Sequence, residues 1–133
     1  MQTPAKEIMS RKVLFVREGD SVEQTVKLLV NNKITGLPVT DAEGRMVGVV
    51  SEYDILVQLS SKVDPSPEDF RQPIQFSRTV QAVAEETPLN EVVQLFIESK
   101  FRRLPVLDPA KKIVGIITRR DLMRVYYYRT RIL

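Results

Sequence analysis

Two short polar motifs have the residue types to bind a sugar, and they stand 67 positions apart in the chain. Ser51 and Asp54 follow one apolar run, and Thr118 and Asp121 follow another. If each motif opens a helix, its hydroxyl and carboxylate project from one face of the first turn, because positions three apart are neighbours there. Such a carboxylate accepts hydrogen bonds from a vicinal diol such as that of ribose, and the free N–H groups of the turn favour a phosphate. The same pattern is an ordinary helix cap, so the spacing alone leaves both interpretations open.

A duplication surrounds the two motifs. The tripeptide Leu-Pro-Val at 37–39 recurs at 104–106 in the same register, and residues 13–56 and 80–123 share 13 identities in 44 aligned positions. Each copy has the pattern of a β-α-β-β-α unit, and one such unit alone has too small a core to be stable. We therefore expect an α/β (α+β) protein in which two repeats pack against each other about a pseudo-two-fold axis.

Hydrophobic periodicity predicts the same elements in both copies. The expected strands cover 13–16, 36–39 and 45–50 in the first copy and 80–83, 101–106 and 112–117 in the second, with helices after the first and third strand of each. Asp20, with Glu23 three residues later, and Thr87, with a proline after it, are the expected caps of the first helices. Because proline lacks an N–H, we expect the strand that contains Pro38 to lie at a sheet edge or to begin there.

Composition along the chain predicts three parts. The first repeat with an N-terminal arm takes 1–59, a linker takes 60–73, and the second repeat with a C-terminal helix takes 74–133. The linker is rich in serine and proline, and we expect one helical turn at 67–70. The arm is polar apart from Ile8 and Met9, so it is either a frayed terminus or a segment packed on the domain. The second copy has Gln75 and Phe76 at the corresponding positions.

Composition also excludes several classes of protein and site. The chain has no cysteine, which excludes disulfides and thiolate chemistry, and no histidine, which removes the commonest general base and metal ligand. The nucleotide-binding loops G-x-x-x-x-G-K-[ST] and G-x-G-x-x-G are absent as well. We therefore expect neither catalysis nor a metal site. No apolar run is long enough to span a bilayer and no secretory signal opens the chain, so we expect a cytoplasmic protein without a membrane partner.

In each copy, Leu-Pro-Val, an acidic turn and the pattern apolar-Val-Gly-apolar-apolar-Thr/Ser-x-x-Asp follow one another. This double arrangement resembles the CBS domain pair, or Bateman module, and the resemblance covers residues 8–124. It implies a stand-alone CBS-pair protein that forms a homodimer and requires no cofactor. Clefts between the repeats would bind AMP, ADP, ATP or S-adenosylmethionine as a regulatory ligand. The bound ligand would shift the packing of the repeats or the dimer interface and so modulate an unidentified partner protein.

The resemblance also implies which residues bind the ligand. The Thr/Ser-x-x-Asp motifs would contact ribose, through Ser51 and Asp54 in one cleft and through Thr118 and Asp121 in the other. The base would be framed by Lys12, Val13 and Gly36 in the first cleft and by Thr79, Val80 and Arg103 in the second.

The two clefts are expected to differ in charge. Glu52 follows the hydroxyl of the first motif, whereas Arg102, Arg103, Arg119 and Arg120 are near the second motif in the sequence. Guanidinium groups neutralise phosphates, often bidentately, and a glutamate repels them. We therefore expect the second cleft to bind a phosphorylated nucleotide, and the first to be empty or to bind a less charged adenosyl ligand. The alternative for the arginines is a solvated basic face.

Two other functions remain open at this point. Arginines at 119, 120, 124, 129 and 131 are interleaved with three tyrosines at 126–128, a pattern that could hold the phosphates and stack the bases of a nucleic acid. The tyrosines could instead complete a packing face or a dimer contact. The remaining alternative is a ligand-free scaffold that only dimerises.

Overall fold

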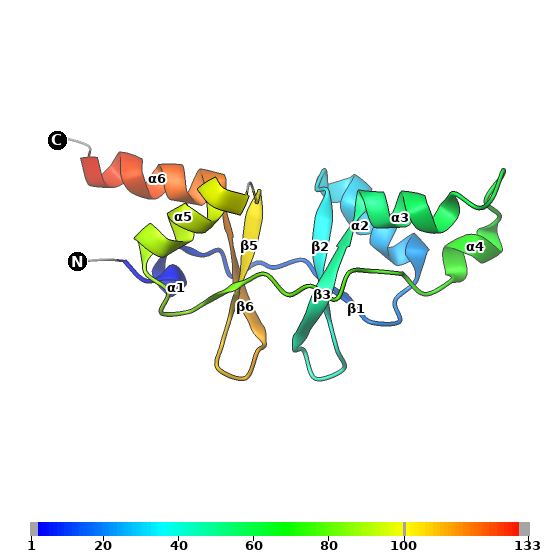
Figure 1. Ribbon diagram of the computed structural model, residues 1–133, viewed down its shortest axis with the longest axis horizontal. Helices are drawn as coiled ribbons and strands as arrows, with labels where there is room; N and C mark the ends of the chain where they lie inside the picture. The colour runs from blue at the N-terminus through cyan, green and yellow to red at the C-terminus, as the bar shows by residue number, and fades with distance from the viewer. Residues whose placement is uncertain (1–2, 100, 131–133) are drawn as a thin grey trace. The chain divides into compact units, whose positions relative to one another are not determined.

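The computed structural model describes residues 3–99 and 101–130 of the chain. These residues form two units. We call residues 14–80 the central unit, and the described parts of 1–13 and 81–133 together the C-terminal unit. Each unit contains one three-stranded sheet with its helices (Figure 1). The expected α+β fold with two β-α-β-β-α repeats is therefore confirmed.

The central unit contains the elements of the first repeat in the expected order. They are β1 (Val16–Arg17), α2 (Val22–Asn32), β2 (Gly36–Thr40), β3 (Met46–Ser51) and α3 (Glu52–Leu59). The helical turn expected in the linker is present as α4 (Pro67–Arg71). In the sheet, β2 lies between its neighbours, parallel to β1 and antiparallel to β3.

The C-terminal unit repeats this arrangement. Its elements are α1 (Ala5–Ile8), β4 (Val83–Ala84), α5 (Leu89–Ser99), β5 (Arg103–Leu107), β6 (Ile113–Thr118) and α6 (Arg119–Thr130). The strand order is β4-β5-β6, again with one parallel and one antiparallel pairing. Leu104 pairs with Ile117 as Leu37 pairs with Val50, so the duplication extends to the register of the ladders.

The strand that contains Pro38 corrects one expectation. β2 begins two residues before the proline and is the middle strand, so it neither lies at an edge nor starts at Pro38. Pro38 is opposite Val49, whose N–H and C=O bond to Ser77 at 2.9 and 3.0 Å rather than to β2. On the other side, β1 pairs only with the last two residues of β2. The missing N–H of Pro38 therefore leaves no ladder bond unmade.

The caps of the first helices also differ from the expectation. Ser21 caps α2, because its Oγ accepts from the N–H of Gln24 at 3.1 Å and its N–H donates to Gln24 Oε1 at 3.0 Å. Asp20 instead closes the preceding turn, where its Oδ2 accepts from the N–H of Arg17 at 2.8 Å. Thr87 closes the corresponding turn of the C-terminal unit, where its Oγ1 accepts from the N–H of Ala84 at 3.0 Å. A polar residue before a helix serves either as cap or as turn, and its position alone does not distinguish them.

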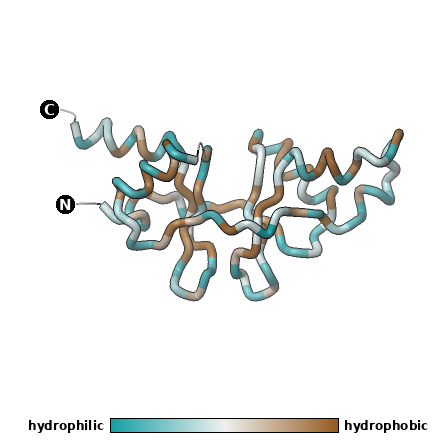
Figure 2. The backbone as a smooth tube through the Cα atoms, in the orientation of Figure 1, coloured by the Kyte–Doolittle hydropathy of each residue, from teal (hydrophilic) through white to brown (hydrophobic). Residues whose placement is uncertain are grey.

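Each unit has its own hydrophobic core. In the central unit the core consists of Val16, Val22, Leu29, Leu37, Val39, Val50, Ile55 and Ile74. In the C-terminal unit it consists of Ala5, Ile8, Val83, Leu89, Val92, Phe96, Leu104, Val106, Ile117 and Leu122. Figure 2 shows hydrophobic stretches along the strands and hydrophilic residues at the hairpin tips. Among the described helices, none combines the length and apolar character of a bilayer-spanning segment.

The segments that precede the two repeats are exchanged between the units. Ser10 pairs with Ile116 of β6, with both N···O distances at 2.9 Å, so the N-terminal arm packs on the second repeat. Ser77, which is 67 positions later, pairs in the same way with Val49 of β3. The packing groups residues 3–13 with the second repeat and residues 60–80 with the first, whereas the sequence division places the arm with the first repeat and ends the linker at residue 73. Each exchanged segment covers the outer edge of a strand whose N–H and C=O groups would otherwise lack a partner.

Gly48 and Gly115 are the positions where the exchanged segments cross the sheets. A Cβ on Gly48 would overlap the carbonyl oxygen of Ser77 and lie 2.8 Å from the ring of Phe76. A Cβ on Gly115 would overlap the Sδ of Met9 and lie 2.6 Å from its Cγ. Phe76 therefore occupies in one unit the place that Met9 occupies in the other, and glycine provides the space for the close approach.

Candidate functional site

The first motif forms a closed set of hydrogen bonds at the start of α3. Asp54 Oδ2 accepts from the N–H of Ser51 at 2.8 Å and from its Oγ at 2.9 Å. The N–H of Asp54 donates back to Ser51 Oγ at 3.2 Å. The motif is thus a reciprocal capping box, as the structural interpretation of the spacing predicts. Within the described residues, Asp54 Oδ1 has no partner, so one carboxylate oxygen remains for a ligand.

The second motif has the same geometry at the start of α6. Asp121 Oδ2 accepts from the N–H of Thr118 at 2.8 Å and from its Oγ1 at 3.0 Å, and the N–H of Asp121 donates to that Oγ1 at 3.3 Å. The difference lies at the other oxygen, because Asp121 Oδ1 is 3.3 Å from a guanidinium nitrogen of Arg124. Asp121 is buried, whereas the Arg124 side chain is 57% exposed. Because the Arg124 end of this ion pair is exposed, solvent screens it, and we expect it to contribute about 0–1 kcal/mol.

The sheets bring one further predicted residue to each motif. Gly36 is opposite Ser51 in the pairing of β2 with β3. Arg103 is opposite Thr118 in the pairing of β5 with β6. Each unit therefore gathers three of the predicted residues: Gly36, Ser51 and Asp54 in the central unit, and Arg103, Thr118 and Asp121 in the C-terminal unit.

The predicted ring of four arginines is only partly present around the second motif. Arg102 and Arg119 line a groove of about 620 Å³ between α5 and α6, together with apolar residues, and neither Thr118 nor Asp121 lines that groove. The reason is helical geometry: Arg119 and Asp121 are two positions apart, which places them on nearly opposite sides of α6. Arg120, which is exposed, adjoins Asp121 in sequence.

Arg124 is a site residue that lies outside the Ser/Thr–Asp motif. In the sequence it belongs to the basic C-terminal cluster, and in the structure it lies one turn after Asp121, on the same face of α6. The spacing from Asp121 was therefore the available signal. The first repeat has Val57 at this position, so the two motifs differ in charge at their own carboxylates.

Four of the six residues expected to frame the base lie in the exchanged segments. Lys12 and Val13 belong to the arm of the C-terminal unit, and Lys12 is exposed. Thr79 and Val80 end the central unit, where Thr79 Oγ1 is 3.0 Å from Ser77 Oγ and Val80 is 45% exposed. Their expected partners, the Ser/Thr–Asp motifs, lie in the other unit in both cases. The role of these four residues stays a prediction.

These carboxylates can perform recognition chemistry. Each cap fixes the rotamer of its carboxylate, so a ligand diol would meet an acceptor that is already oriented. Hydrogen bonds to an ionised carboxylate are about twice as strong as neutral ones. The N-terminal turn adds the favourable end of a helix dipole for an anionic group. The arrangement therefore fits a ligand with a vicinal diol and, near Arg124, a negative charge.

A family model of the CBS domain matches residues 5–61 and 74–128. The chain belongs to the CBS domain family. The two matches correspond to the two repeats, so the resemblance that the sequence motifs indicate is confirmed. In this CBS pair, the capped Ser/Thr–Asp motif occurs once in each domain.

Known relatives include stand-alone CBS-pair proteins. CBSX2, a chloroplastic CBS domain-containing protein of Arabidopsis thaliana, is 34% identical over an alignment that covers 82% of this chain and 56% of CBSX2. CBSX1 from the same plant is 31% identical over 89% of this chain and 61% of CBSX1. This CBS pair therefore spans about three fifths of the length of these two relatives.

Two similar structures contain adenosyl ligands. The crystal structure of CBSX2 in complex with AMP has a TM-score of 0.74 and 33% identity, over 96% of this chain and 98% of that one. The CBS domain pair of protein MJ0100, in complex with 5′-methylthioadenosine and S-adenosyl-L-methionine, has a TM-score of 0.71 and 26% identity, over 93% and 99% of the two chains.

Proposed function

We propose that this CBS pair is a regulatory module that binds an adenosyl ligand through the Ser/Thr–Asp motif of each domain. One observation carries the proposal: Asp54 and Asp121 have the same capped geometry in both units, with one oxygen held by the helix start and one outside the cap. The complexes of CBSX2 with AMP and of MJ0100 with S-adenosyl-L-methionine support this ligand class. The proposed role is binding rather than catalysis, and it leads to altered contact with a partner protein.

The two motifs would prefer different ligands. Arg124 can turn from Asp121 to a phosphate, and Arg120 and Arg103 add positive charge around the second motif. The second motif would therefore take AMP, ADP or ATP. Glu52 follows Ser51 in the first motif and is exposed, so a ligand without phosphates, such as S-adenosylmethionine, is favoured there.

A thermal-shift series tests the proposal. Unfolding is followed in the presence of AMP, ADP, ATP, NADH and S-adenosylmethionine, each over a range of concentrations. A ligand that binds only the folded state adds about 2.7 kcal/mol of stability at a hundred times its dissociation constant. We expect at least one adenosyl compound to raise the melting temperature. If none does, the chain is a scaffold without a nucleotide ligand.

Salt dependence separates this function from nucleic-acid binding. The arginines and tyrosines of α6 favour that second candidate, because Tyr126, Tyr127 and Tyr128 are all exposed. Binding to nucleic acid weakens steeply with salt, since each phosphate contact releases counterions. We expect adenosyl binding to change little between low and moderate salt. A labelled oligonucleotide that binds at moderate salt, without an adenosyl-induced thermal shift, would favour the second candidate.

The exposed face of α5 and α6 supports the expected homodimer. Ile97, Met123 and Tyr126 border the groove between these helices and are 66%, 64% and 46% exposed. A contiguous apolar face of this kind is typical of a surface that associates. We expect Met123→Glu to convert a dimer to a monomer in light scattering. Val63→Glu is the matched control, because Val63 is 97% exposed in the segment between α3 and α4.

The compartment also belongs to the proposal. We expect a cytoplasmic location, whereas the names of CBSX1 and CBSX2 place these relatives in chloroplasts. Imaging of a fluorescent fusion in the source cells tests this.

A further inference from the structure

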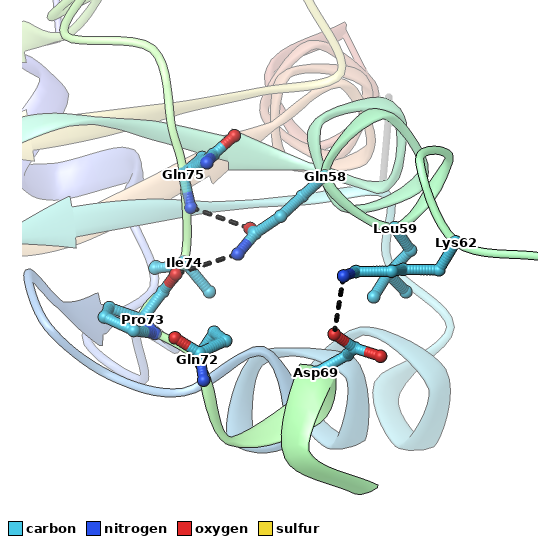
Figure 3. Close-up of a pocket in the computed structure, with 8 residues that line it drawn as sticks. All are labelled: Gln58, Leu59, Lys62, Asp69, Gln72, Pro73, Ile74 and Gln75. Atoms are coloured by element: carbon cyan, nitrogen blue, oxygen red, sulfur yellow. Dashed lines mark hydrogen bonds and ion pairs between the residues drawn. The ribbon is translucent and has the colours of Figure 1, made fainter. Parts of the chain in front are cut away.

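A cavity of about 640 Å³ opens in the central unit, at the opposite end of α3 from the Ser51–Asp54 motif. Its wall consists of Gln58, Leu59, Lys62, Asp69 and residues 72–75 (Figure 3). The segment 60–73 has no counterpart in the second repeat, so much of this wall is specific to the linker between the two CBS domains. The cavity is therefore not a copy of the duplicated motif.

Gln58 gives the wall a fixed shape. Its Nε2 donates to the carbonyl oxygen of Pro73 at 2.9 Å, and its Oε1 accepts from the N–H of Gln75 at 2.9 Å (Figure 3). Both ends of the amide are thus bound to the main chain, which ties α3 to residues 72–75. Ile74, between these two bonds, is 5% exposed and belongs to the core. The cavity is therefore preformed, as ligand pockets commonly are.

A cation and an anion line the cavity side by side. Asp69 Oδ1 and Lys62 Nζ form an ion pair at 3.8 Å, a separation longer than a hydrogen bond (Figure 3). Asp69 Oδ2 accepts from the N–H and the Oγ of Ser66 at 2.8 and 3.0 Å, so the carboxylate is held in place. The bond from the Ser66 N–H, opposed by partial desolvation and aided by the Ser66 hydroxyl and Lys62, lowers the pKa of Asp69. The carboxylate is therefore ionised at neutral pH.

This pair of charges selects for a zwitterion. A nucleotide or another anion would be repelled by Asp69, and a simple cation would be repelled by Lys62. An α-amino acid satisfies both, because its carboxylate can bind Lys62 while its ammonium group binds Asp69. Leu59 and Pro73 provide apolar surface for a side chain. We propose that this cavity binds a free α-amino acid with an apolar side chain, as a site separate from the adenosyl motifs.

The test uses L-leucine as the probe and the full chain as the protein. Wild type is titrated with L-leucine, leucinamide and N-acetyl-leucine, and binding is followed by NMR shifts of the Gln58 and Gln75 signals. L-leucine should bind with saturation. Leucinamide lacks the carboxylate and N-acetyl-leucine lacks the ammonium group, so each should bind at least about tenfold more weakly, as expected for the loss of a charge-assisted hydrogen bond.

Two variants test whether Lys62 and Asp69 bind the charged groups of L-leucine. Lys62→Met should weaken L-leucine binding by about tenfold or more. Lys27→Met is the control and should bind as wild type, because Lys27 is an exposed lysine of α2 outside the cavity. Asp69→Asn keeps an oxygen for the bonds from Ser66 and should lose affinity for L-leucine while the fold is retained. The proposal is overturned if L-leucine does not saturate at millimolar concentration, if leucinamide binds equally well, or if Lys62→Met binds as wild type.

Discussion

Arg124 and Val57 make the two otherwise matching carboxylates chemically different. Asp54 and Asp121 are held by the same three hydrogen bonds, but only Asp121 has a guanidinium on its second oxygen. A ribose hydroxyl that approaches Asp121 competes with Arg124, whereas Asp54 Oδ1 has no cationic partner among the residues that the structure describes. The cost of this competition is small because the Arg124 end of the ion pair is exposed. Whether Arg124 raises or lowers the affinity for a ligand depends on whether that ligand has a phosphate that Arg124 can bind instead of Asp121.

Arg124→Leu tests this exchange. The variant should bind adenosine as well as wild type or up to about fivefold more tightly, because the competing ion pair is worth at most about 1 kcal/mol. It should bind AMP about tenfold more weakly, since a charged hydrogen bond to phosphate is lost. Calorimetry with both ligands measures the two changes, and Arg129→Leu on the same helix is the control. Equal changes for adenosine and AMP would contradict the assigned role of Arg124.

At the scale of elements, the sequence predicts what local chemistry determines. The repeated apolar patterns and the Ser/Thr–Asp spacing predicted the helices, the order of the strands and the start of α3 and α6, although β1 and β4 begin only at the last residue of their expected ranges. The caps at Asp20 and Thr87 were wrong because a side chain before a helix can bind backward into a turn as readily as forward into the helix. The place of Pro38 was wrong because it depends on Ser77, which is distant in the sequence.

Separation along the sequence also explains why the packing of the exchanged segments could not be predicted. Nothing in the local pattern of Ile8 and Met9 indicates that this arm pairs with β6 rather than with the adjacent first repeat. The available signal was Gly115, since a glycine inside an apolar strand often marks the close approach of another segment. Lys12, Val13, Thr79 and Val80, which were expected to frame the base, lie in these segments, which is why their role stays a prediction while the capped motifs are defined within each unit.

The two crossing glycines should respond unequally to alanine. Gly48→Ala places a methyl group against the main-chain oxygen of Ser77, which cannot move without breaking its pairing with Val49. Gly115→Ala meets the flexible end of Met9, which can adopt another rotamer. Overpacking of this kind typically lowers the free energy of unfolding by about 1–3 kcal/mol. We expect the loss for Gly48→Ala to lie at or above the upper end of this range and the loss for Gly115→Ala to lie near the lower end. Urea unfolding measures the difference, and equal losses would contradict the description of the crossings.

At the scale of the whole molecule, the exchange of segments means that the sequence repeats and the structural units do not contain the same residues. The fragment 14–80 contains every element of the central unit, including the segment with Ile74, Phe76 and Ser77. The fragment 14–73 ends before this segment and leaves the edge of β3 uncovered. A single buried isoleucine contributes about 1.5–3 kcal/mol, which is a large share of the stability of so small a domain.

We therefore expect 14–80 to unfold with a cooperative thermal transition and 14–73 to lack one. Circular dichroism at 222 nm during heating provides the measurement. Addition of a peptide that corresponds to residues 74–80 to the shorter fragment is the control, because it restores the missing segment in trans. If the two fragments unfold alike, the segment 74–80 is not an integral part of the central unit.

The claim that the capped carboxylates bind an adenosyl ligand is tested most directly by calorimetry of AMP binding to wild type, Asp54→Ala and Asp121→Ala. Each substitution removes the carboxylate of the capping box and costs about 0.5–2 kcal/mol of stability, so circular dichroism must first establish that the variants are folded. The account predicts that wild type and Asp54→Ala bind AMP with similar affinity, and that Asp121→Ala loses at least about tenfold. If Asp54→Ala abolishes AMP binding while Asp121→Ala retains it, or if both variants bind as wild type, the account is contradicted.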